Sequence, residues 1–325
     1  MSQKKATIVF FSILVFLFVG TAGYCAEFAN PNLLADSKMV TDSIGKPDLV
    51  ILDVRDAKEY KEGHIPGAIN LGGMGAKVLR DATARAYTIV PKIEKILGDA
   101  GISNDKHIIL YGKANETYEN TVPFWVLEYL GCNSSNLKCT VSYYDGGFER
   151  WVADGGKSEI KGNKPPAAAF KAHLSASRLA SSAEVLSVVE GKEHNVVIVD
   201  ARTPAEFEGT DIRALRGGHL KGAINIPVQK SFDPKTYRML SASEQAAVYK
   251  DVPKDKRVIL HCQTGTRSTW TYLTLRLLGY HNVANWDDSW QVWGSNVKYP
   301  VENEQWYNFV KINNTIKAVE ALQKK

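Results

Sequence analysis

The sequence predicts an α/β protein made of two similar domains, each a mainly parallel sheet with helices on both faces. Three segments of the first half return in the same order in the second half: 50–70 as 197–225, 105–112 as 255–262, and 143–151 as 285–293. Such self-similarity is the mark of a duplicated domain. Within each copy, short runs rich in Ile and Val alternate with helical stretches, and that alternation is typical of parallel sheets.

Four runs have the length and composition of fully buried strands: 49–54, 107–111, 196–199 and 258–261. Helical stretches between strands include 181–190 and 269–278. We therefore expect a first domain at 35–160, a linker at 161–177, a second domain at 178–302 and a C-terminal helix at 303–325. The linker contains Pro165 and Pro166 followed by three alanines, which suits an extended connection.

The N-terminus has the layout of a secretory signal peptide over residues 1–26. Lys4 and Lys5 precede an apolar stretch at 8–19, which small residues follow. A membrane anchor is the alternative, but the apolar stretch is shorter than the roughly 20 residues that cross a bilayer comfortably. A lipid anchor at Cys25 also stays open. We expect export to the periplasm or cell envelope, with membrane contact only through this segment.

Composition and charge exclude some classes of partner. The chain has 325 residues, 44% of them hydrophobic and 23% charged, as in an ordinary globular protein. Its formal net charge of +5 falls to +3 without Lys4 and Lys5, and the sequence has no block of basic residues. We therefore expect no nucleic-acid partner.

The chain contains four cysteines, and two of them are close in sequence. Cys132 and Cys139 can form a disulfide if the protein is exported. The alternative is that both are small buried apolar residues. The sequence leaves this choice open.

Cys262 stands alone, between the predicted strand 258–261 and a predicted helix that starts at Ser268. The loop 262–267 directs backbone N–H groups and the start of a helix toward the sulfur. These groups and Arg267 favour an anion, so the thiol is expected to ionise below its usual pKa of about 8.5. Gly265 permits the tight path of the loop. Cys262 is thus a candidate nucleophile, against the alternative of a structural cysteine.

Both copies resemble rhodanese domains. The resemblance rests on the stretches at Asp53 and Asp200, on the Gly-His stretches at Gly63 and Gly218, and on the sequence CQTGTRS that starts at Cys262. It covers nearly all of residues 35–300. It implies two rhodanese-like domains, of which only the second carries a catalytic cysteine.

The resemblance also implies a double-displacement reaction. Cys262 would take the outer sulfur of a small anionic donor such as thiosulfate, mercaptopyruvate or polysulfide, hold it as a persulfide, and pass it to cyanide, a thiol or a protein thiol. No metal or organic cofactor is implied. In the first copy Gly112 stands where the second has Cys262, so we expect that domain to shape the cleft without carrying sulfur.

The loop departs from the thiosulfate type of this family. Members of that type carry Arg and Lys directly after the cysteine, where this chain has Gln263 and Thr264, and an Arg where it has Glu206. The donor would thus be met by the loop and by the remaining arginines: Gln263, Thr264, Gly265, Thr266, Arg267, Arg202 and Arg216. For Arg202 and Arg216 a structural ion pair is the alternative. We expect Asp200, His219 and Ser268 to support the site.

Two other functions remain open. A cysteine phosphatase or arsenate reductase also has a His-Cys pair followed by an Arg at the end of its loop, like His261, Cys262 and Arg267 here. Those enzymes have five residues between the Cys and the Arg, whereas this chain has four. A non-enzymatic carrier of sulfur or selenium in the cell envelope is the alternative from another class, since the basic residues of the thiosulfate type are missing.

Overall fold

The structure is a computed structural model that describes residues 27–72, 79–80 and 90–308. The predicted signal peptide at 1–26, Cys25 included, lies outside these residues. Within the described part of the chain, none of the helices combines the length and the apolar character that a bilayer crossing requires.

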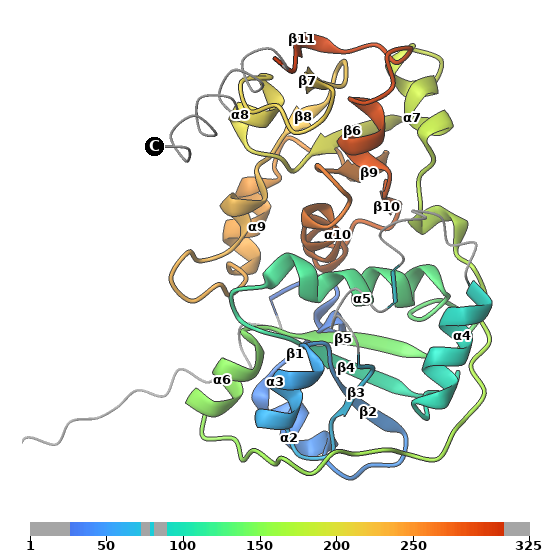
Figure 1. The fold of residues 1–325 in the computed structure, drawn as a ribbon, viewed down its shortest axis with the longest axis vertical. Helices are drawn as coiled ribbons and strands as arrows, with labels where there is room; N and C mark the ends of the chain where they lie inside the picture. The colour runs from blue at the N-terminus through green and yellow to red at the C-terminus, as the bar shows by residue number, and fades with distance from the viewer. Residues whose placement is uncertain (1–26, 73–78, 81–89, 309–325) are drawn as a thin grey trace, which may run out of the picture.

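The first domain is a five-stranded parallel sheet between two layers of helices (Figure 1). Its strands, in the spatial order β1-β5-β4-β2-β3, are β1 (Leu34–Ala35), β5 (Thr140–Tyr144), β4 (His107–Tyr111), β2 (Leu49–Asp53) and β3 (Ile69–Asn70). Its helices are α2 (Ser37–Ser43), α3 (Ala57–Glu62), α4 (Val90–Asp99), α5 (Thr117–Tyr129) and α6 (Gly147–Ala153). Side chains alternate across β4: Ile109 faces the core under α2, α3 and α6, and Ile108 and Leu110 face the core under α4 and α5.

The second domain repeats this plan with a four-stranded parallel sheet. Its strands, in the order β10-β9-β6-β8, are β10 (Val283–Asn285), β9 (Arg257–His261), β6 (Val196–Asp200) and β8 (Ile224–Asn225). Its helices are α7 (Ser182–Val189), α8 (Pro204–Phe207), α9 (Ala242–Val248), α10 (Arg267–Leu277) and α11 (Ser289–Trp293). Ile259 faces the core under α7 and α11, and Leu260 faces the core under α10. The described residues also include three short 3-10 turns: η1 (Pro31–Leu33), η4 (Ala176–Arg178) and η5 (Val228–Ser231).

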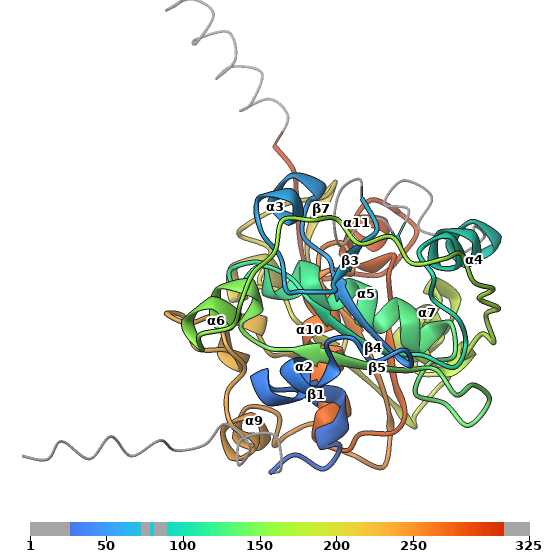
Figure 2. The ribbon, with the colours of Figure 1, turned by 90° about the horizontal axis from the view of Figure 1, so that it is seen from below.

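The two domains meet through α5 and α10, which lie side by side at the centre of the molecule (Figures 1 and 2). One apolar core runs through this contact and joins both sheets. Inside it, the buried carboxylate of Glu128 accepts hydrogen bonds from Arg276 Nε at 3.0 Å and from the Tyr272 hydroxyl. A buried charge needs such partners, so this group favours one arrangement of the domains.

The expectation of a C-terminal helix at 303–325 is wrong for its first residues. The strand β11 (Glu302–Trp306) pairs antiparallel with β7 (Arg216–His219). The backbone N–H and C=O groups of β7 need hydrogen-bond partners. All side chains of β11 are exposed, so this pairing, and no apolar face of its own, makes the segment a strand. Residues 309–325 lie outside the described part of the chain.

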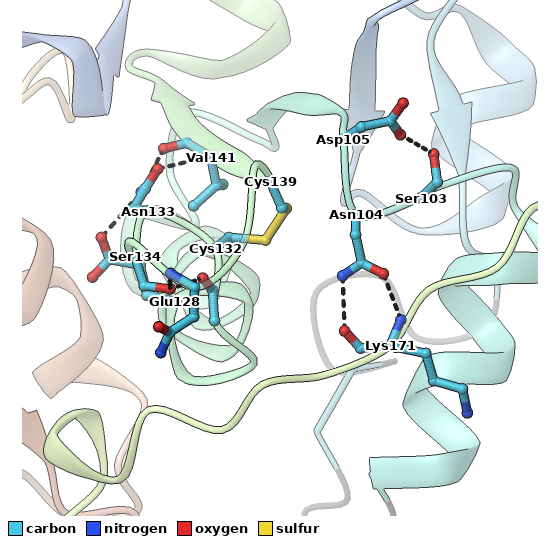
Figure 3. Close-up of a disulfide and its surroundings, with 12 residues drawn as sticks. Ser103, Asn104, Asp105, Glu128, Cys132, Asn133, Ser134, Cys139, Val141 and Lys171 are labelled. Carbon is cyan, nitrogen blue, oxygen red and sulfur yellow. Dashed lines mark hydrogen bonds between the residues drawn. A yellow bond between two sulfur atoms is a disulfide. The ribbon is translucent and has the colours of Figure 1, made fainter.

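The two middle cysteines form a disulfide that ties the end of α5 to the start of β5 (Figure 3). Both are also buried, so the bond lies within the packed interior of the first domain. Asn133 supports the turn, because its side chain donates to the Val141 carbonyl and accepts from the Val141 N–H, both at 3.0 Å. The alternative of two free buried thiols is thereby excluded in this structure.

Candidate active site

Cys262 lies between β9 and α10, at the carboxyl edge of the second sheet, and is 1% exposed. Its N–H donates to the Ser289 hydroxyl at 3.2 Å, and the Ser268 hydroxyl lies 3.8 Å from its sulfur. The Ser268 hydroxyl in turn donates to Asn285 at 2.6 Å. The sulfur is therefore held in a packed, polar turn where ligands commonly bind in parallel sheets.

The carbonyls of the turn are bound by groups that surround it. Four donors reach four successive carbonyls: Trp290 N–H to Cys262 at 3.1 Å, Gln291 N–H to Gln263 at 2.8 Å, the Arg80 guanidinium to Thr264, and Asn285 Nδ2 to Gly265 at 3.1 Å. All described peptide bonds are trans, so each following N–H points away from the donor that holds the carbonyl before it.

The four N–H groups that follow these carbonyls are those of Gln263, Thr264, Gly265 and Thr266. Within the described residues, none of the four donates a hydrogen bond to the protein. Unpaired N–H groups gathered in one turn form an anion-binding concavity. The turn thus has the donors to hold a negatively charged sulfur or donor group.

Gly265 is the one position of this turn with a left-handed backbone, at φ +77°. A Cβ atom there would lie 2.5 Å from a carboxylate oxygen of Asp287 and 2.8 Å from its carbonyl oxygen. Both the conformation and the close approach therefore require glycine.

Arg267 lies at the start of α10 and forms a two-pronged ion pair with Glu206 of α8, with both N···O distances at 2.7 Å. Burial opposes the charge of Arg267, but the hydrogen bonds with Glu206 and the charges of Cys262 and Glu206 raise its pKa above the ordinary value. Burial is also the largest influence on Glu206 and by itself would raise its pKa, but the hydrogen bond and charge of Arg267, the Thr203 N–H and the charge of Arg213 together lower that pKa. Glu206 thus balances the charge of Arg267, and Arg213 lies 3.8 Å from the same carboxylate.

Arg202 is buried and serves a structural ion pair. Its Nη2 donates to Asp200 at 2.6 Å and to the Gly218 carbonyl at 2.8 Å, and its guanidinium lies over the Trp290 ring, 4.2 Å from the centroid. Burial alone would raise the pKa of Asp200, but the charge and hydrogen bonds of Arg202, together with His261, lower it. Of the two alternatives for Arg202, the geometry favours the ion pair over contact with a donor.

His261 is a buried neighbour of the same carboxylate, with its Nε2 3.4 Å from Asp200 Oδ2. Burial is the main cause that lowers the pKa of His261 to about 4, and the charge of Asp200 only partly opposes it. The imidazole is therefore neutral near pH 7. Its Nδ1 lies 3.2 Å from the Cys262 carbonyl oxygen.

Three other predicted residues contact parts of the protein other than the sulfur. Arg216 is buried, and its Nη1 donates to Glu304 of β11 at 2.6 Å, so it also takes the structural alternative. His219 stacks on Phe207 with ring centroids 3.7 Å apart, so it ties the end of β7 to the end of α8. Gln263 directs its amide to the Arg213 carbonyl at 2.8 Å.

The corresponding turn of the first domain is filled by protein. A Cβ atom on Gly112 would lie 1.8 Å from Asn120 Oδ1, so the amide of Asn120 occupies the space next to the missing side chain. Tyr111 takes the place of His261, and its hydroxyl donates to Asp53 at 2.6 Å. This turn therefore lacks both a nucleophile and the room for one.

Several residues of the site were not singled out from the sequence. Asn285, Asp287 and Ser289 lie in the repeated segment 285–293, at and just after the end of β10, which pairs with β9, and this position could have marked them. Arg80 comes from the other domain, and no pattern in the sequence connects it with the loop of Cys262.

Comparisons with known proteins identify relatives of this chain. The family description of the rhodanese-like domain matches residues 37–154 and again 183–296. The sulfur carrier protein TtuD of Thermus thermophilus is 31% identical over 84% of this chain and 98% of its own length. The thiosulfate sulfurtransferase of Corynebacterium glutamicum is 28% identical over 85% of this chain and 92% of its own length.

Solved structures share the fold. The 3-mercaptopyruvate sulfotransferase SseA of Escherichia coli aligns with a TM-score of 0.66 at 24% identity, over 80% of this chain and 99% of its own. An anaerobic ergothioneine biosynthesis enzyme of Chlorobium limicola aligns with a TM-score of 0.73 at 18% identity, over 85% of this chain and 71% of its own.

Proposed function

We propose, from the premise that this chain belongs to the rhodanese family and contains two rhodanese-like domains, that it transfers sulfane sulfur through a persulfide on Cys262. It is a rhodanese-type sulfurtransferase in the general sense that its relatives support. The persulfide, the donor and the acceptor are the proposal.

The observation that carries the proposal is the turn of Cys262. Its carbonyls are bound from outside, and its four N–H groups have no protein acceptor among the described residues. In the first step the thiolate of Cys262 would attack the outer sulfur of the donor, and the bond from that sulfur to the rest of the donor would break. An acceptor thiolate or cyanide would then attack the same outer sulfur and release the Cys262 thiolate. No resident cofactor takes part in either step.

The charge around Cys262 favours a donor that carries little negative charge. Glu206 balances Arg267, and Gln263 and Thr264 add no cation next to the cysteine. Among the described residues, every guanidinium next to the turn is paired with a carboxylate, so a dianion such as thiosulfate would meet no unpaired one there. A persulfide or an organic polysulfide carries less negative charge and needs only the N–H groups of the turn. We therefore infer that thiosulfate is a poor donor and that sulfur chains on a thiol are good ones.

The test is the intact mass of the protein after separate exposure to thiosulfate, mercaptopyruvate and polysulfide. We expect a gain of one sulfur with polysulfide, its loss after a thiol is added, and no gain in Cys262→Ser. Absence of the gain with all three donors, or its presence in Cys262→Ser, would contradict the proposal.

A non-enzymatic sulfur carrier is the second candidate, and the balanced ion pair of Arg267 and Glu206 is the observation that favours it. The name of the Thermus relative fits the same reading. A persulfide that survives small thiols and cyanide but is lost to one specific protein would support a carrier. Multiple turnovers with a small acceptor would support an enzyme. The paired state of Arg267 argues against a phosphatase or arsenate reductase, because such a reaction needs that cation free for an oxyanion.

Export is the remaining part of the proposal. The disulfide of the first domain fits an oxidising compartment, where such bonds persist. The N-terminal sequence of the mature protein, together with its mass, would distinguish cleavage, a retained anchor and a lipid on Cys25.

A further inference from the structure

Arg80 belongs to the domain without the nucleophile, yet it binds the loop that carries Cys262. Its buried guanidinium donates to the Thr264 carbonyl and, at 2.8 Å, to the Thr266 hydroxyl. The same group forms an ion pair with the buried Asp287 at 2.7 Å. One side chain of the first domain thus binds three groups at the Cys262 loop of the second domain: the Thr264 carbonyl, the Thr266 hydroxyl and the Asp287 carboxylate.

The contact with the Thr264 carbonyl has a direct consequence for the next peptide group. In a trans peptide the carbonyl and the following N–H point in opposite directions. Gly265 is free of a Cβ and has a left-handed backbone, so this peptide plane could turn if its carbonyl were released. Arg80 thereby determines which way the Gly265 N–H faces.

We propose that Arg80 is a positioning residue for sulfur chemistry: by binding the Thr264 carbonyl from the neighbouring domain, it keeps the Gly265 N–H among the donors that hold the sulfur on Cys262. The first domain then completes the active site as well as stabilising it. This inference rests on the proposed role of Cys262 as the sulfur-carrying nucleophile.

A second cross-domain contact provides a matched control. Asp145 stands in the first repeat where Asp287 stands in the second, and it also meets an arginine of the other domain. The Nε of Arg238 lies 3.6 Å from its carboxylate, and the Met239 N–H donates to it at 3.2 Å. Each domain thus supplies one arginine to the other: Arg80 lies next to the loop of Cys262, and Arg238 lies next to the filled turn of the first domain.

A purely structural role for Arg80 is the competing explanation. Arg80 could serve only to neutralise Asp287, a buried carboxylate that is costly to leave without a cation. The two roles separate in the double variant Arg80→Met/Asp287→Asn. In it the side chain at position 287 has no charge to neutralise, but the Thr264 carbonyl still lacks the donor that Arg80 supplies.

The experiment compares the full-length protein with Arg80→Met, Arg80→Lys, Arg80→Met/Asp287→Asn and Arg238→Met. The readouts are the rate of iodoacetamide alkylation of the Cys262 peptide against pH, followed by mass spectrometry, and the lifetime of the persulfide after polysulfide treatment. Thermal unfolding reports stability separately. We expect Arg80→Met to slow alkylation near pH 7 roughly tenfold, the loss of one charge-assisted contact. The pH profile should move to higher pH, and the persulfide lifetime should shorten.

The double variant should stay as slow as Arg80→Met, while Arg80→Lys should recover part of the rate, since an ammonium can reach some of the three acceptors. Arg238→Met should keep the wild-type profile even where its thermal unfolding temperature falls. A wild-type profile in Arg80→Met, or full recovery in the double variant, would overturn the inference. If Arg80→Met does not fold, a wild-type profile in Arg80→Lys would overturn it as well. A wild type that forms no persulfide refutes the proposed function instead, and the alkylation profile still reports on Arg80.

Discussion

The ion pair between Arg267 and Glu206 leads to a prediction about donor choice. In Glu206→Gln the neutral amide keeps one acceptor oxygen but no charge, so the guanidinium of Arg267 becomes available to an anionic donor. The same carboxylate accepts from the Thr203 N–H at 3.1 Å, and a Gln oxygen can keep that bond at the start of α8. The fold is therefore expected to survive the change, with a loss of about 1–3 kcal/mol in the free energy of unfolding.

The expected gain follows from the two 2.7 Å bonds that now occupy Arg267. A guanidinium released from this pair can form a charge-assisted hydrogen bond to thiosulfate, worth about 1.5–3 kcal/mol in a buried site. Part of this is lost because the neutral amide still competes for Arg267. We therefore expect kcat/KM for thiosulfate to rise roughly tenfold, about 1.4 kcal/mol, mainly through a lower KM.

The assay is steady-state transfer of sulfur from thiosulfate to cyanide at two ionic strengths, with polysulfide as the comparison donor. Glu208→Gln is the control, because Glu208 is exposed and pairs with Asn303, at 2.8 Å, instead of Arg267. The gain in Glu206→Gln should shrink at high salt, since the new contact is partly screened. An unchanged KM, or an equal change in Glu208→Gln, would refute the reasoning about charge at this site.

Four further predictions concern the nucleophile, the inert turn, the disulfide and pH. Cys262→Ser should abolish sulfur transfer and shift the thermal unfolding temperature by only a few degrees, because a hydroxyl of similar size cannot act as this nucleophile; more than a few percent of residual transfer would move the site elsewhere. Gly112→Cys should give no transfer in a Cys262→Ser background, since the space beside it is filled, and a persulfide detected by mass in that double variant would contradict this. Replacing Cys132 and Cys139 by Ser should lower the free energy of unfolding by about 2 kcal/mol and leave transfer intact, as measured by denaturant unfolding and by activity. The pKa of His261 is lowered to about 4, so the unfolded state takes up this proton first as the pH falls; stability present above about pH 6.5 is then lost between about pH 6.5 and pH 4, and His261→Tyr should flatten this part of the stability-against-pH curve.

Much of the fold was predictable because the repeat and the strand composition are local properties of the chain. The runs 49–54, 107–111, 196–199 and 258–261 correspond to the central strands β2, β4, β6 and β9. The segment 303–306 was predicted wrongly, since its strand exists only through pairing with β7. Its own sequence has no apolar periodicity to indicate that partner.

The candidate site divides in the same way. The strand, turn and helix around Cys262, and the glycine at 265, follow from residues that are neighbours in sequence. Whether each arginine near the site is free or paired does not follow from neighbours. Arg202 is turned inward by Asp200, and Arg267 by Glu206, which lies 61 positions away in the chain.

The sequence by itself determined the duplicated α/β architecture, the loss of the nucleophile at Gly112 and the place of Cys262 before a helix. These features depend on residue type and order alone. Only the tertiary structure decided which charges meet: Glu206 balances Arg267, and Arg80 crosses from one domain to the loop of the other. The physical reason is that ion pairs and carbonyl contacts depend on distances of a few ångströms. The packing of α5 against α10, and the pairing of Glu206 on α8 with the start of α10, establish these distances between residues far apart in the chain.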